Sequence, residues 1–150
     1  ESVNFQEGLE VIGEATFANT HIHNLILPNT LESVDYLAFA FCNNLTSVTL
    51  NDGLVALYAT SFGYNKSLTE IVIPQSVTYF PNNAISNHTA GLVIKGYTGT
   101  VAEDVANAFL YSLSTRQLQY RSALGSYYYA LAIPDHSHDA PGTCHLCLYV

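Results

Sequence analysis

The sequence has little charge, and very little of it is positive. Charged residues make up 11% of the 150 residues, and the formal net charge at pH 7 is −8. The lysines and arginines, which form no basic stripe, are Lys66, Lys95, Arg116 and Arg121. Because phosphate-rich partners are held mainly by clustered lysine and arginine, we expect neither nucleic acid nor an anionic membrane as a partner.

Long apolar runs are also absent, although 49% of the residues are apolar. No stretch is long enough to cross a bilayer, so we expect no membrane span. With so few charges, serine, threonine, asparagine and tyrosine must cover much of the surface. Such an uncharged polar surface is commoner on secreted proteins, and we expect an extracellular or cell-surface protein.

The sequence contains none of the short motifs that mark common catalytic sites. It has no G-x-S-x-G, P-loop or H-E-x-x-H pattern. Acidic residues such as Glu32, Asp35, Asp52 and Glu70 are scattered rather than paired, which is typical of solvated surfaces. We therefore expect no enzymatic activity and, apart from a candidate zinc ion discussed below, no cofactor.

The sequence does contain a repeat. Residues 31–74 show the same apolar pattern twice, with each position shifted by 23 residues. The matching pairs are Leu31/Leu54, Val34/Leu57, Phe39/Phe62, Leu45/Leu68, Val48/Ile71 and Leu50/Ile73. A fixed period of about 20–29 residues indicates a solenoid, in which each repeat buries its apolar side by stacking on its neighbours.

The pattern continues on both sides of this stretch. The repeat before it contains Leu9, Ile12, Phe17, Ile22, Leu25 and Leu27. A shortened repeat after it contains Val77, Phe80, Ile85, Leu92 and Ile94. We expect one parallel sheet with strands near residues 3–5, 25–27, 48–50, 71–73 and 92–94. The phenylalanines of the three full repeats should stack as a ladder, with Ile85 at its end.

The repeat resembles the BspA-type leucine-rich repeats of surface proteins. Residues 38–45, Ala-Phe-Ala-Phe-Cys-Asn-Asn-Leu, match the A-F-x-x-C-x-x-L signature of that family. The resemblance implies a right-handed leucine-rich-repeat solenoid, mainly β with a helical cap (the α/β solenoid class), with about four repeats of 22–23 residues. It also implies a non-enzymatic adhesion or interaction module with a protein or glycan ligand, and a buried Cys42.

The period ends at Gly96, and a helix should follow. Thr100 and Glu103 fit a capping box at its start, and an apolar face is formed by Val101, Val105, Ala108 and Phe109. Arrays of this family end in a similar segment, which covers the last repeat. We therefore divide the chain into a solenoid at 1–96, a helical cap at 97–113 and a tail at 114–150.

The tail contains a predicted hairpin, with strands at Leu118–Leu124 and Tyr127–Ile133. The second strand is aromatic and uncharged, and it should be buried. Since the cap helix should already partly cover the near end of the array, whereas the other end at residues 3–5 is uncovered, we expect this strand to contact the N-terminal repeat of another chain. The alternative function is thus a self-assembling subunit of an extracellular filament, a head-to-tail homo-oligomer.

The end of the tail contains a candidate zinc site. His136, His138, Cys144 and Cys147 supply the four nitrogen and sulfur ligands that tetrahedral zinc requires. The competing interpretation is a disulfide between Cys144 and Cys147, which an oxidising compartment favours.

Three N-glycosylation sequons begin at Asn44, Asn65 and Asn87. They fall at similar places in successive repeats, on the turn that enters each strand. In a secreted eukaryotic protein these asparagines would be glycan sites, and in a bacterial protein they would be turn-forming residues.

A thermal melt tests the zinc interpretation. If His136, His138, Cys144 and Cys147 bind zinc, Zn²⁺ should raise the melting temperature and EDTA should lower it, because a ligand bound by the folded state alone stabilises that state. A melting temperature that responds to neither reagent rules out the zinc site.

Overall fold

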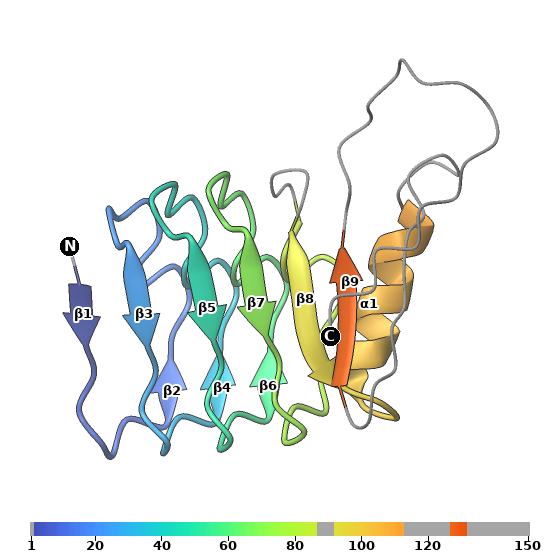
Figure 1. Ribbon diagram of the computed structural model, residues 1–150. Helices are drawn as coiled ribbons and strands as arrows, with labels where there is room; N and C mark the ends of the chain where they lie inside the picture. The colour runs from blue at the N-terminus through green and yellow to red at the C-terminus, as the bar shows by residue number, and fades with distance from the viewer. Residues whose placement is uncertain (1, 87–91, 113–126, 132–150) are drawn as a thin grey trace, which may run out of the picture.

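The computed structural model describes residues 2–86, 92–112 and 127–131. Among these residues the chain winds through about four turns of a parallel-sheet β-solenoid, and one short helix follows the last turn (Figure 1). Each full turn has two short strands, one in each of two sheets, and a third side that contains no strand.

The first sheet contains the strands that the repeat predicts. Its order is β1-β3-β5-β7-β8-β9, and the pairs from β1 to β8 are parallel. The parallel strands are β1 (Ser2–Asn4), β3 (Asn24–Ile26), β5 (Ser47–Thr49), β7 (Glu70–Val72) and β8 (Val93–Tyr97). The register pairs Val3, Leu25, Val48, Ile71 and Ile94 in succession. The predicted repeat alignment is therefore confirmed.

A second parallel sheet lies behind the first in Figure 1 and was not predicted. It contains β2 (Val11–Ile12), β4 (Ser33–Val34) and β6 (Ala56–Leu57), and a bridge between Ala56 and Tyr79 extends it to the fourth turn. Strands of two residues are too short to show the alternation of apolar and polar residues by which a strand is recognised.

The core between the two sheets contains the predicted phenylalanine ladder. The Phe17 and Phe39 ring centroids lie 5.3 Å apart at an interplanar angle of 7°, and those of Phe39 and Phe62 lie 5.2 Å apart at 11°. Ile85 is buried in the fourth turn, as expected. Phe5 packs with its edge against the Phe17 ring, at 5.3 Å and 89°.

The third side of each turn is joined to its neighbours by main-chain hydrogen bonds. The Phe17 N–H donates to the Ala38 carbonyl at 2.9 Å, and the Phe39 N–H donates to the Ser61 carbonyl at 2.8 Å. Each full turn bends here through two residues with positive φ, between 52° and 60°: Ala15 and Asn19, Leu37 and Phe41, and Thr60 and Tyr64. The bend thus recurs at equivalent positions and is part of the repeat.

Helix α1 (Val101–Ser112) follows the last solenoid strand and packs beside β8 and β9 (Figure 1). Among residues 101–108, whose side chains the structure describes, Val105 is buried as predicted, together with Ala102 and Ala106, while Ala108 is only half-buried. The Phe109 side chain lies outside the described part. The small residues are needed because the helix approaches the strand closely: a Cβ on Gly96 of β8 would collide with the Cβ of Ala102.

The N-terminus of α1 is capped by a variant of the predicted box. The Glu103 carboxylate accepts a hydrogen bond from the Gly99 N–H at 2.8 Å, one residue before the expected donor. The Thr100 hydroxyl donates to the Tyr97 carbonyl at 2.7 Å, and the Thr100 carbonyl accepts from the Glu103 N–H at 3.0 Å. The cap therefore ties the helix to the end of β8.

Strand β9 (Tyr127–Leu131) pairs antiparallel with β8 of the same chain, from Tyr97 opposite Tyr127 to Val93 opposite Leu131. The strand itself was predicted, but it was expected to contact the N-terminal repeat of another chain, because the helix should already partly cover the near end of the array. The strand instead pairs within its own chain, and a contact with another chain stays a prediction. In the structure α1 leaves the backbone edge of β8 available, and β9 pairs with it. The other predicted hairpin strand, 118–124, lies outside the described residues.

The phenylalanine ladder leads to a stability prediction. Phe39→Ala should lower the free energy of unfolding by about 3–5 kcal/mol, because it empties a fully buried site between two rings. Phe41→Ala is the matched control. Phe41 is exposed and has one ring neighbour, Tyr64, so its loss should cost about 1 kcal/mol. If urea denaturation shows that Phe39→Ala and Phe41→Ala lower the free energy of unfolding equally, the stacked phenylalanines do not stabilise the core in this way.

Candidate ligand-binding face

The outward side chains of the first sheet form two rows across the solenoid. Leu25, Val48 and Ile71 point into the core and are buried, so their neighbours on each strand point outward. One row contains Asn24, Ser47, Glu70 and Val93, and the other contains Asn4, Ile26, Thr49, Val72 and Lys95. Most of these side chains are neutral.

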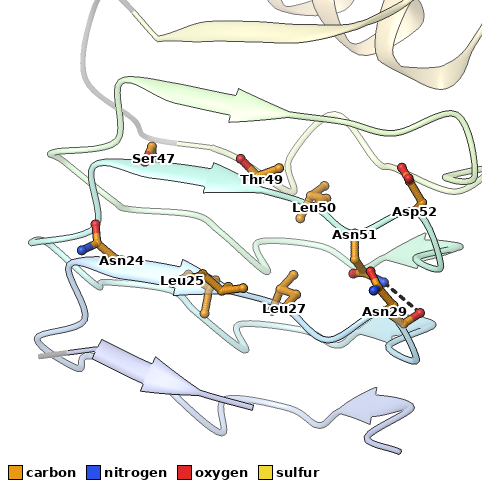
Figure 2. Close-up of a pocket in the computed structure, with 10 residues that line it drawn as sticks. Asn24, Leu25, Leu27, Asn29, Ser47, Thr49, Leu50, Asn51 and Asp52 are labelled. Atoms are coloured by element: carbon orange, nitrogen blue, oxygen red, sulfur yellow. Dashed lines mark hydrogen bonds between the residues drawn. The ribbon is translucent and has the colours of Figure 1, made fainter. Parts of the chain in front are cut away.

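An open depression of about 500 Å³ lies over β3 and β5 (Figure 2). The lining residues are Asn24, Leu25, Ile26, Leu27, Asn29, Ser47, Thr49, Leu50, Asn51 and Asp52. The three leucines are buried in the core, so the exposed lining consists mainly of polar side chains and Ile26. Such a lining suits a ligand that has both polar and apolar surface.

Ile26 is the most exposed large apolar side chain among the described residues, at 75%. It lies at the edge of the depression, between Asn4 and Thr49 in its row. Ile26 was not predicted as a binding residue, although the sequence contains a signal of its exposure. Leu25, Ile26 and Leu27 are three consecutive apolar residues in a strand whose alternate positions should face solvent.

Asn51 forms one wall of the depression and is 8% exposed. Its Nδ2 donates to the Leu31 carbonyl at 2.9 Å and lies 3.5 Å from the Asn29 carbonyl (Figure 2). Its Oδ1 has no hydrogen-bond partner within the described parts of the chain. A buried acceptor without a donor is costly, and this cost is offset in part by the hydrogen bonds that Nδ2 makes.

An ion pair lies on the same face, two strands from Ile26. The Lys95 ammonium is 2.6 Å from the Glu70 carboxylate, and both side chains are about one-third exposed. Glu70 and Lys95 are on β7 and β8, so the pair bridges the last two parallel strands of the array.

The candidate zinc ligands His136, His138, Cys144 and Cys147 all lie outside the described residues. Within residues 2–86, 92–112 and 127–131, no three histidine, cysteine, aspartate or glutamate side chains are grouped so that they could hold a metal. The zinc site and its competing disulfide therefore stay predictions.

Asn65, the second sequon asparagine, is fully buried. Its Nδ2 donates to the carbonyls of Phe39 and Phe62, both at 3.0 Å. The register between β5 and β7 makes Asn65 equivalent to Cys42, whose thiol is also buried and donates to the Phe17 carbonyl at 3.2 Å. Asn65 thus holds consecutive turns together, and the folded chain leaves no room for a glycan on its amide.

Asn44 occupies a different position from Asn65, contrary to the expectation that the sequons are equivalent. The same register makes Asn44 equivalent to Ser67. Asn44 is half-exposed, and its Nδ2 lies 3.4 Å from Nε2 of His23. A glycan on Asn44 stays a prediction, and Asn87 lies outside the described residues.

In the described part of the chain, no helix has the length and apolar character needed to cross a membrane.

Comparison with known proteins identifies the repeat. Residues 1–116 match the sequence profile of the BspA-type leucine-rich repeat region in six copies. No match was found to a curated protein or to a solved structure.

A substitution at Asn65 should show its structural role. Asn65→Ala should lower the free energy of unfolding by about 1–3 kcal/mol, because it leaves two buried carbonyls without their donor. Asn44→Ala, which also removes a sequon, should change it by less than about 0.5 kcal/mol. If chemical denaturation shows the same change in unfolding free energy for both variants, the hydrogen bonds of the Asn65 amide do not stabilise the fold.

Proposed function

Because the chain belongs to the BspA-type leucine-rich repeat family, we propose that it is a non-enzymatic module that binds a protein ligand, as in adhesion, through the outward face of its first sheet. Proteins of this family are typically associated with the cell surface, and the fold generally serves protein interaction rather than catalysis. The location we propose is therefore extracellular or at the cell surface.

The observation that carries the proposal is the exposure of Ile26 beside a polar depression. Binding energy at protein interfaces is concentrated in a few apolar or aromatic side chains surrounded by groups that exclude water. Asn24, Ser47 and Thr49 supply such a surround. Their hydroxyls and amides lose less on desolvation than charged groups would.

Two alternatives are less well supported. A glycan would also hydrogen-bond to the asparagines and hydroxyls, but it would leave the apolar Ile26 side chain without a matching surface. A self-assembling filament subunit was expected because the tail strand needed a partner in another chain. Since β9 pairs with β8 of its own chain, that reason no longer holds.

The proposed face can be tested on immobilised matrix and cell-surface proteins. Ile26→Asp should weaken the binding of the chain to its ligand at least about tenfold, because it places a charge at the apolar centre of the contact. Phe41→Asp is the matched control, since Phe41 is 41% exposed on the third side of its turn, outside the first sheet. Surface plasmon resonance should show normal binding for Phe41→Asp. Unchanged binding of Ile26→Asp would refute the proposed face.

A further inference from the structure

The second sheet has exposed aromatic and apolar side chains on its outward side. Tyr58 is 43% exposed and Tyr79 is 50% exposed, and their ring centroids lie 5.5 Å apart at an angle of 52°. Val55 and Val11 are 45% and 50% exposed. A contiguous exposed apolar patch with polar residues around it marks an interaction site, whereas a single exposed apolar side chain does not.

Carboxylates lie beside these side chains in the neighbouring turns. The Val55 N–H donates to the Glu32 carbonyl, and the Glu32 N–H donates to the Glu10 carbonyl, both at 2.8 Å, so these three residues form one column across the turns. Three residues further along each turn, the register between β4 and β6 makes Asp35 equivalent to Tyr58. Neighbouring turns are about 4.8 Å apart, so Asp35 and Tyr58 occupy adjacent positions of the backbone in consecutive turns.

We call this surface the tyrosine face and define it by Glu10, Val11, Glu32, Asp35, Val55, Tyr58 and Tyr79. Among the described residues, neither lysine lies on the tyrosine face. Lys95 lies on the first sheet, and Lys66 directly follows buried Asn65 on the third side of its turn. The tyrosine face therefore combines exposed rings with carboxylates that no lysine of the described residues neutralises.

We propose that the tyrosine face is a second docking surface, separate from the Ile26 face, and that it binds an extended polypeptide segment rich in arginine. The charge on the face is complementary to a cationic partner. The rings select arginine in particular, because a planar guanidinium can stack on Tyr58 while it donates to the adjacent Asp35. A lysine ammonium can pair with a carboxylate but cannot stack in this way.

The proposal predicts a preference that can be measured with short peptides. The probes are a peptide of alternating arginine and serine, its lysine counterpart, and its glutamate counterpart. The intact chain should bind the arginine peptide about threefold more tightly than the lysine peptide, because of the contact between the guanidinium and the ring. It should not bind the glutamate peptide. Calorimetry at low and physiological ionic strength gives these affinities.

Two pairs of variants separate the face from general charge. Glu32→Gln with Asp35→Asn should weaken binding of the arginine peptide about fivefold. Glu7→Gln with Asp104→Asn changes the net charge equally but leaves both proposed faces intact, so binding should stay within about twofold. If the two double variants weaken binding equally, the attraction comes from net charge alone and the proposal is wrong.

The rings are tested by Tyr58→Leu combined with Tyr79→Leu. This variant should remove the preference for arginine over lysine while it retains the binding that depends on charge. Phe41→Leu with Tyr64→Leu removes the other exposed ring pair, whose centroids lie 4.5 Å apart, and should leave the preference unchanged. An arginine preference that survives loss of Tyr58 and Tyr79 would overturn the proposal. Ile26→Asp should not change the binding of these peptides. The test of the tyrosine face is therefore independent of the test of the proposed face around Ile26.

Discussion

The stacking of each turn on the next is the constraint on which the rest of this structure depends. Phe39 is fully buried because the Phe17 and Phe62 rings lie nearly parallel to it on either side. Aligned rings require turns of nearly equal length, and close packing leaves little tolerance for a change in volume. The same alignment brings the thiol of Cys42 and the amide of Asn65 to the carbonyls of the preceding turn. The inward residues are thus determined by their neighbours, and the outward residues are not.

A stacked array must also be closed, because its last turn has no neighbour to cover its core. Here two elements share this role. Helix α1 covers the core side of β8 with Ala102, Val105 and Ala106, and strand β9 pairs with the backbone edge of β8. A helix alone can bury side chains but cannot satisfy the open N–H and C=O groups of an edge strand. The combination therefore meets both requirements.

Much of the fold could be predicted from the sequence because stacking makes the apolar pattern periodic. The period gave the first sheet, its register and the phenylalanine ladder. It could not give the second sheet, whose strands have only two residues. The sequon at Asn65 misled for a different reason: a three-residue motif contains no information about burial, whereas the register that aligns Asn65 with Cys42 shows its place in the core. The exposure of Ile26 depends on the residues that lie around it in the folded chain. The apolar repeat pattern contains no information about these neighbours.

The two outward faces differ because equivalent positions in successive turns are free to carry different side chains. One row of the first sheet contains Ile26, Thr49 and Lys95, while the second sheet places Asp35 beside Tyr58. The faces lie on opposite sides of a shared core (Figure 1), so a partner on one does not obstruct the other. Substitutions on separate surfaces of a rigid core should act additively. A ligand that reached both faces would then gain avidity through effective concentration, without any change in the solenoid itself.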